Sequence, residues 1–380
     1  MHDVVIVGGG PVGLYLGILL LQRGLSIAVL EQRATAPAHS KAIGIHPPAL
    51  EALDRAEVAR DLVAAGVKID RGVALSNGRE IARLSFDRPG MQPPFILSVP
   101  QWRTEAVLER RLRALDPGAL VRGARVGRVE HRSTHAVVSA DRAGSLEKFE
   151  ARFVIGADGA RSAVRAGLGI RAPERVHPDA YLMGDFADPG TNRTTAVLHL
   201  EAAGVVESFP LPEGMRRWVV RMPSAVIGAA PEDLSAIVHA RTGISPDPRT
   251  STMLSSFTPR TTIARNSVQG RTVLIGDAAH EVSPIGGQGM NLGWLDAAAL
   301  APLLTAASAR GSAGPGAADF LRYEADRRRA ALTAARRAHV NMLLGRPLPP
   351  DVVKARDALL RSLFGAPPVA AWATRRFTMQ

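Results

Sequence analysis

Residues 4–13 read VVIVGGGPVG, and this stretch decides the fold of the chain. Four β-branched apolar residues are followed by the pattern G-x-G-x-x-G at Gly8, Gly10 and Gly13. An apolar helical stretch runs over 12–21, and a second apolar run, 26–30, ends at Glu31. This order of strand, glycine turn, helix and strand is typical of a unit that binds a dinucleotide.

Each glycine of the turn has its own physical reason. Gly8 permits a tight turn, Gly10 lets backbone N–H groups approach a pyrophosphate, and Gly13 lets the helix lie close to the strand. The N-terminus of the helix offers unsatisfied N–H donors and about half a positive charge to the phosphates. Glu31 is placed to accept hydrogen bonds from ribose hydroxyls.

Composition limits the class of protein. The chain has 380 residues, 46% hydrophobic and 22% charged, which is typical of a soluble globular protein with two or three domains. The net charge of +12 comes from scattered arginines, including those at 327–329, which we interpret as a solvated surface. Only 4% of residues are aromatic, which disfavours a nucleic-acid partner. The absence of cysteine excludes disulfides, thiolate catalysis and cysteine-ligated metal, and it agrees with a cytoplasmic location.

Two β-rich insertions interrupt the α/β pattern. A hairpin is predicted around Asn77-Gly78 within 71–97, and short strands are predicted throughout 177–264. A single helix is predicted over 48–65, and the C-terminal part from 318 onward is mostly helical. Val4–Gln22 is explained by a buried strand and helix, so we expect no membrane-spanning segment.

Two further motifs follow apolar strands. Residues 156–162 read GADGARS and contain Asp158 and Gly159, and residues 276–280 read GDAAH and contain Gly276 and Asp277. Each motif puts a carboxylate at the C-terminal end of a strand, where ligands of open α/β sheets bind. Taken singly, either motif is equally well explained as a capped turn.

With these three motifs in this order, residues 1–345 resemble the FAD-dependent, single-component aromatic hydroxylases of the p-hydroxybenzoate hydroxylase type, the class A flavoprotein monooxygenases. The resemblance implies an α/β fold: a Rossmann-type FAD-binding domain (1–70, 98–176 and 265–345), an inserted β-sheet substrate domain (71–97 and 177–264) and C-terminal helices (346–380). The implied FAD-binding residues are Gly8, Gly10, Pro11, Val12, Gly13, Glu31, Gln32, Arg33, Lys41, Gln101, Asp158, Gly159, Gly276, Asp277, Pro284, Gly287, Gly289, Met290 and Asn291.

The glycines between 286 and 289 suggest how the flavin is stabilised. They lead into a helix, whose free N–H groups can face the flavin pyrimidine ring. A helix N-terminus contributes up to about 2 kcal/mol toward an anion in a partly buried site. The glycines permit close approach of the backbone.

For the substrate, we expect contacts from the inserted sheet, although each of these residues is also explained as sheet core: Met183, Phe209, Leu211 and Trp218. His46, His199 and Pro284 are candidates for a catalytic role, and we assign no catalytic base. His280 is expected to pack within its turn. No metal site is predicted, because His280-Glu281 is not followed by a second histidine.

The resemblance implies a reaction in which NADH or NADPH reduces FAD and a C4a-hydroperoxyflavin hydroxylates an aromatic or phenolic small molecule with O2. Two alternatives remain open: a FAD-dependent reductase of the geranylgeranyl reductase type, and Baeyer–Villiger oxygenation on the same scaffold. The expected partners are a small aromatic or polycyclic substrate and O2. We expect a monomer or homodimer.

Overall fold

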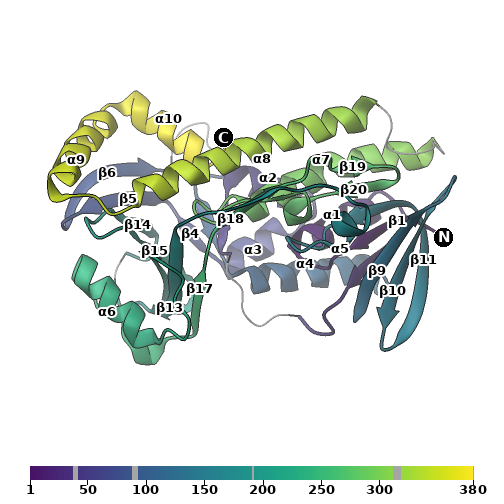
Figure 1. Cartoon of the computed structure of the whole chain (residues 1–380), viewed down its shortest axis with the longest axis horizontal. Helices are drawn as coiled ribbons and strands as arrows, with labels where there is room; N and C mark the ends of the chain where they lie inside the picture. The colour runs from purple at the N-terminus through teal and green to yellow at the C-terminus, as the bar shows by residue number, and fades with distance from the viewer. Residues whose placement is uncertain (37–41, 88–92, 191, 311–317, 380) are drawn as a thin grey trace.

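The apolar runs found in the sequence form the centre of an eight-stranded sheet (Figure 1). The computed structural model describes residues 1–36, 42–87, 93–190, 192–310 and 318–379. The sheet has the order β19-β20-β11-β1-β2-β8, with the hairpin β9–β10 attached to β11. Its strands are β1 (His2–Val7), β2 (Ile27–Glu31), β8 (Leu120–Arg122), β9 (Ala124–His131), β10 (Ala136–Arg142), β11 (Ser145–Gly156), β19 (Val268–Gln269) and β20 (Thr272–Leu274).

Both faces of β1 are buried, which explains its unbroken apolar sequence. Val4 and Ile6 face a layer of helices formed by α1 (Pro11–Leu21), α4 (Gln101–Leu115) and α7 (Gly289–Ala309). Val5 and Val7 face the hairpin β9–β10 and the short helix α5 (Ala163–Gly167). The strands β1, β2, β11 and β20 are parallel to one another, so their C-terminal ends meet at one edge of the sheet.

A second sheet of seven strands has the order β17-β13-β16-β15-β14-β5-β6. The predicted hairpin at Asn77-Gly78 is confirmed, since it joins β5 to β6 and both residues have positive φ. One face of this sheet packs on helix α6 (Pro231–Thr242), and the opposite face packs on Ile285 and on Met342 of helix α8 (Ala318–Leu344). The strands are β5 (Arg71–Ser76), β6 (Arg79–Ser85), β13 (Ala180–Ala187), β14 (Thr195–His199), β15 (Val206–Leu211), β16 (Met215–Met222) and β17 (Met253–Phe257).

Two helix predictions were wrong. The helix expected over 48–65 is two helices, α2 (Pro47–Asp54) and α3 (Ala59–Ala65), because Glu57 between them has φ 60°. The second error lies in the stretch 177–264, which was expected to hold strands alone but contains α6 (Pro231–Thr242). Asp233 caps this helix by accepting a hydrogen bond from the Ala230 N–H (2.8 Å), and Gly243 ends it in a left-handed conformation.

The described part of the chain is completed by two three-stranded sheets and the C-terminal helices α8, α9 and α10. The small sheets have the orders β3-β7-β4 and β12-β18-β21. Helix α8 extends from beside the main sheet to the second sheet, where α9 and α10 pack against β6 (Figure 1). The bounds are β3 (Gly44–Ile45), β4 (Val67–Ile69), β7 (Ile96–Ser98), β12 (Glu174–Val176), β18 (Arg260–Ile263), β21 (His280–Glu281), α8 (Ala318–Leu344), α9 (Pro350–Phe364) and α10 (Pro367–Phe377).

Within the described residues, one helix is long and apolar enough to cross a membrane. This helix is α7, and half of its apolar window is buried inside the protein. It also carries Asp296, which is buried and paired with Arg327. These contacts are those of a core helix.

Candidate functional site

The glycine turn after β1 is closed by contacts that only glycine allows. Gly8 has φ +110°, and a Cβ atom there would lie 2.3 Å from the carbonyl oxygen of Ala157. A Cβ atom on Gly13 would lie 2.0 Å from the carbonyl oxygen of Gly8. The first motif is therefore packed directly against the residues of the second motif, and helix α1 lies close to its preceding strand.

The N-terminus of α1 is left free for a ligand. No side chain caps the helix at Gly10, and its first turn carries no acidic residue. Among the described residues, no atom lies within 4 Å of a Cβ atom built on Gly10. Pro11 and Val12 are held in place by α7, since Trp294 donates a hydrogen bond to the Pro11 carbonyl and Val12 packs on Gly293. Unsatisfied N–H groups beside open space suit an anion such as a pyrophosphate.

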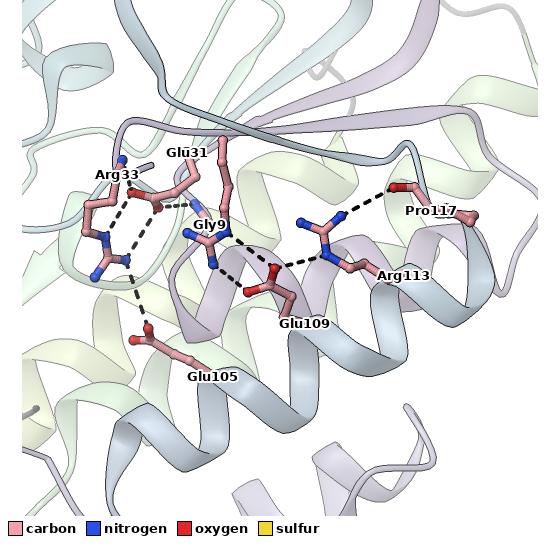
Figure 2. Close-up of polar contacts among 8 residues, drawn as sticks. Gly9, Glu31, Arg33, Glu105, Glu109, Arg113 and Pro117 are labelled. Atoms are coloured by element: carbon pink, nitrogen blue, oxygen red, sulfur yellow. Dashed lines mark hydrogen bonds and ion pairs between the residues drawn. The ribbon is translucent and has the colours of Figure 1, made fainter. Parts of the chain in front are cut away.

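Glu31 is fixed beside this turn by hydrogen bonds, as Figure 2 shows. Its carboxylate accepts one from the Gly9 N–H (2.8 Å) and others from the Arg33 N–H (2.8 Å) and Nε (2.9 Å). Burial acts to raise the pKa of Glu31, but the bonds from Arg33 and Gly9 outweigh it and hold the pKa below its usual value. The carboxylate is therefore ionised and oriented at the C-terminal end of β2.

The neighbouring predicted residues form a polar group around Glu31. The Gln101 amide, at the start of α4, donates a hydrogen bond to Glu105 (2.8 Å), which lies 4.0 Å from Arg33. Gln32 is exposed. Lys41 lies outside the described residues. Glu105 was not anticipated from the sequence, although its spacing from Gln101 on one helix face could have suggested it.

The carboxylate of the second motif acts as a local cap. Asp158 accepts hydrogen bonds from the Ser162 hydroxyl (2.5 Å) and from the Val164 N–H (3.1 Å) at the start of α5. Gly159 has φ +80°, and a Cβ atom there would meet nothing within 4 Å. The structure thus shows the capped turn that the sequence left as an alternative, while the Asp158 backbone lies against Gly8.

The third motif brings Asp277 to the same edge of the sheet. Gly276 has φ +58° and packs on Val12 of the first motif. A Cβ atom built on Gly276 would lie 3.3 Å from the Val12 side chain. Asp277 is exposed between buried neighbours, and its Oδ1 lies 3.9 Å from the Cβ position of Gly289. Because the surrounding protein displaces part of its hydration, the pKa of Asp277 is raised to about 6. Its carboxylate is accessible to a ligand at the start of α7.

Behind Asp277 lies a buried ion network. His280 Nε2 is 2.6 Å from Asp296 Oδ2, and Arg327 Nε donates to Asp296 Oδ1 at 2.6 Å. Arg327 was expected to be solvated, but its side chain keeps only 18% of its exposure because it neutralises Asp296. His280 packs within its turn as predicted. The network holds the third motif against α7 and α8.

The loop before α7 presents backbone rather than side chains. Gly286 and Gly287 have φ +94° and +66°, whereas Gly289 is the first residue of the helix. No side chain caps α7, and its first turn has no acidic residue. Pro284 is exposed and Met290 is partly buried. As at α1, free N–H groups are available to an electronegative group.

Asn291 and His46 support this loop from inside the protein. Asn291 is fully buried, accepts a hydrogen bond from the His46 N–H (2.8 Å) and donates to the Gly287 carbonyl (2.7 Å). His46 is 2% exposed, and burial lowers its pKa to about 4. The His46 ring lies edge-on to Phe377 of α10 (centroids 5.9 Å apart). The His46 ring is therefore neutral near pH 7, and its backbone N–H supports the loop through Asn291.

The predicted substrate residues are divided between the two faces of the second sheet. Met183, Phe209 and Leu211 point to the face that packs on Ile285, the neighbour of Pro284. Trp218 and His199 lie on the opposite face, where their rings stack (centroids 6.3 Å apart) and Trp218 packs on α6. Successive strand residues point to opposite faces, so the sheet itself separates these two from the loop. Trp218 and His199 therefore lie away from Met183, Phe209 and Leu211.

Three polar residues on the loop-facing side were missed. Asp185 and Arg217 form a two-bond ion pair across neighbouring strands, with both N–O distances 2.7 Å. Glu207 lies on the same face, as its register with Val219 shows. Strand alternation from Phe209 predicts that Glu207 shares its face, so this residue could have been identified from the sequence.

These features fit a bound FAD. One edge of the sheet carries two uncapped helix N-termini, open space beside Gly10 as far as the described residues show, and two acidic side chains at strand ends. A dinucleotide needs donors for its pyrophosphate and acceptors for its ribose and ribityl hydroxyls, and both kinds of group are present.

Comparison with known proteins gives the same family. A family model described as "FAD binding domain" matches residues 1–338. The bifunctional 12-dehydrotetracycline 5-monooxygenase/anhydrotetracycline 6-monooxygenase of Streptomyces rimosus is 33% identical over 366 residues, which cover 92% of this chain and 71% of that protein.

Solved structures are similar along the whole chain. The p-nitrophenol 4-monooxygenase PnpA of Pseudomonas putida DLL-E4 aligns with a TM-score of 0.89 at 23% identity, covering 100% of this chain and 98% of that one. The anhydrotetracycline hydroxylase OxyS of Streptomyces rimosus aligns with a TM-score of 0.80 at 28% identity, covering 100% and 76%. The first similarity concerns the fold alone.

Proposed function

The chain belongs to the FAD-binding family of class A flavoprotein monooxygenases, and from this premise we propose that it hydroxylates a small phenolic or polycyclic aromatic molecule with O2 and NADH or NADPH. Such chemistry is the property of the cofactor. When bound, FAD takes electrons from the nicotinamide and activates O2 so that one oxygen atom is added to the substrate.

The observation that carries the proposal is the contact among the three distant motifs. A Cβ atom built on Gly8 would collide with Ala157, and Val12 packs on Gly276. Turns far apart in the sequence therefore meet at one edge of the sheet. Because each turn supplies either free N–H donors or a carboxylate, the edge matches a long ligand with phosphates at its centre and hydroxyl groups on both sides.

We propose the following division of tasks along this edge. Glu31, oriented by Gly9 and Arg33, accepts from the adenosine ribose, with Gln32 and Gln101 nearby. The α1 N-terminus at Gly10, Pro11 and Val12 binds the pyrophosphate, and Gly8 and Gly13 permit its approach. Asp158 and Gly159 shape the turn against Gly8. Asp277 accepts from the ribityl hydroxyls; the flavin ring is held by Pro284, Gly287, Gly289, Met290 and Asn291.

The proteins of this family must also position the substrate ring and exclude water. In this chain we propose that the loop-facing side of the second sheet covers the reacting ring, through Met183, Phe209 and Leu211. These apolar side chains bury an aromatic ring favourably. Ile285 joins this sheet face to the loop that would contact the flavin.

The test is to purify the protein and measure its flavin content, then to follow NADH and NADPH oxidation with a series of phenols. We expect a yellow protein with bound FAD and oxidation that is stimulated by a phenol, with a product heavier by one oxygen atom. A flavin-loaded protein that reduces its substrate and consumes no O2 would instead support the reductase alternative. A ketone substrate converted to an ester would indicate Baeyer–Villiger oxygenation.

We also propose that the protein acts in the cytoplasm, where NADH and NADPH are available, as a monomer or homodimer. Sedimentation of the purified protein measures the oligomeric state, and cell fractionation tests the location.

A further inference from the structure

Glu207 is a buried acidic residue for which the described residues provide no partner. It lies on β15, the fourth of seven strands, and retains 9% of its exposure. No hydrogen bond or ion pair to its carboxylate is found among the described residues. Burying a carboxylate without a partner costs free energy, so the presence of Glu207 at this buried position needs an explanation.

The register places Glu207 in a row across the sheet that is otherwise apolar or small. Its direct neighbours are Leu198 of β14 and Val219 of β16, and Met183 follows Val219 in the same row. Phe209 lies two residues further along the same strand, on the same face. β15 has a neighbouring strand on each side, so the remaining exposed area of Glu207 must lie on the sheet face to which its side chain points. The Glu207 carboxylate therefore faces the side on which we propose that the substrate ring binds.

The Tyr181 hydroxyl is a second buried polar group on this face. The Tyr181 side chain has no exposure and its hydroxyl makes no hydrogen bond within the described part of the chain. The charge of Glu207 contributes to raising the pKa of Tyr181, after the larger effect of burial, so the two groups interact through space. An unsatisfied hydroxyl and an unsatisfied carboxyl on one face suit a ligand with a hydroxyl group.

The cations near Glu207 are already neutralised. Arg217 is bound bidentately by Asp185, and Asp179 binds both Arg221 (2.9 Å) and Arg346 (2.9 Å). Among the described residues, a substrate carboxylate would thus meet the negative potential of Glu207 without an unpaired arginine to offset it.

We propose that Glu207 accepts a hydrogen bond from a phenolic hydroxyl of the substrate and thereby selects uncharged hydroxyaromatic molecules over aromatic carboxylates. This inference rests on the proposed function, since it assumes that an aromatic substrate binds at this sheet face. Glu207 has a selective role, because a carboxylate accepts strongly from O–H donors and repels other carboxylates.

Ionisation of Glu207 makes the selection depend on pH. Burial raises the pKa of Glu207 to about 7. Above this pH the group is a charged acceptor, which strengthens a bond from a hydroxyl and increases the repulsion of a carboxylate. The titratable or charged groups facing Glu207 or nearest to it among the described residues are Tyr181, Asp179, Asp185, Arg217, Arg221 and Arg346.

The experiment measures binding by calorimetry to the FAD-loaded protein, with 2-naphthol, 2-methoxynaphthalene and 2-naphthoate as probes. In the wild-type protein, 2-naphthol should bind more tightly as the pH rises from 6 to 8, and 2-naphthoate more weakly. In Glu207→Gln both affinities should be constant over this range. In Glu207→Leu the preference for 2-naphthol over its methyl ether should fall about tenfold, as expected for a lost charge-assisted hydrogen bond.

Glu201→Gln is the matched control, because Glu201 is also buried but accepts from the Asn77 N–H and lies off the proposed substrate face. Flavin absorbance and circular dichroism show that each variant is folded. If Glu207→Gln keeps the wild-type pH dependence, the inference is wrong, whether or not the enzyme hydroxylates phenols. If the selection changes as expected but no oxygenated product forms, the proposed function is wrong and the binding role of Glu207 stands.

Discussion

His280 Nε2 lies 2.6 Å from Asp296 Oδ2, and both side chains are buried where the third motif meets α7. Burial lowers the pKa of His280, but the charge of Asp296 and the hydrogen bond to it outweigh this effect and raise the pKa. Arg327 binds the second oxygen of Asp296, and the Gly276 N–H donates to Oδ2 at 2.9 Å. Asp296 therefore connects two cations and the backbone of the GDAAH turn.

The first prediction follows from this network. Asp296→Asn removes the negative charge and leaves Arg327 buried without a counter-ion. We expect the free energy of unfolding to fall by about 3–5 kcal/mol, measured by urea denaturation. Asp326→Asn, at the exposed neighbour of Arg327, should change it by less than about 0.5 kcal/mol. Equal effects of the two substitutions would show that Asp296 is not the buried counter-ion of Arg327.

A second prediction separates folding from cofactor binding in the glycine turn. Gly13→Ala forces a Cβ atom to within 2.0 Å of the Gly8 carbonyl oxygen, so we expect a protein that is destabilised and colourless. The added Cβ of Gly10→Ala meets no atom of the described residues within 4 Å, so the protein should fold normally but bind FAD weakly. Thermal unfolding and flavin absorbance after dialysis measure the two effects, and a fully yellow Gly13→Ala protein would refute the packing argument.

The third prediction concerns the start of α7. Gly289→Val places its Cβ 3.6 Å from Val282, an ordinary contact, so the protein itself should accept the change. We expect this variant to fold and to lose flavin, because a branched side chain then covers the helix N-terminus. Gly127→Val, on β9 with nothing within 4 Å of its Cβ position, is the control and should keep the flavin. Retention of FAD by Gly289→Val would remove Gly289 from the site.

The fourth prediction is the pH dependence of stability caused by Glu207. The pKa is raised from 4.5 to about 7, so the folded state holds a proton that the unfolded state releases between these values. The free energy of unfolding therefore falls as the pH rises through this window, by about 3 kcal/mol at most. Glu207→Gln should lack this contribution, so its stability relative to wild type should increase from pH 4.5 to 8.

Urea titrations at several pH values measure this difference. Glu232→Gln, at an exposed position in the first turn of α6, should follow the wild-type curve. A pH-independent difference between wild type and Glu207→Gln would show that the carboxyl is not buried in solution.

Local features of the sequence were enough to predict the central unit. The apolar run from Val4 to Val7, the glycines at 8, 10 and 13 and the turn at Asn77-Gly78 each depend on neighbouring residues alone. The structure has the expected strand, helix and hairpin at these places. The signals for α6 are also local, with Pro231 at its start and Gly243 at its end.

Other features depend on which surfaces meet in space. Arg327 reads as a surface residue in an arginine-rich helix, and only the packing of α8 on α7 brings it to Asp296. Trp218 and Phe209 both lie in apolar strands. Only the positions of α6 and of the loop at Ile285 decide which of these two elements each side chain faces.

The sequence by itself determined the dinucleotide-binding unit and the family, because glycine turns and strand ends are defined by short-range backbone geometry. The tertiary structure alone decided the orientation of the second sheet, the burial of Asp296 and the exposure of Glu207 to the proposed substrate side. The reason is physical: a strand's pattern sets which residues share a face, whereas the partner of that face is set by contacts between segments far apart in the chain.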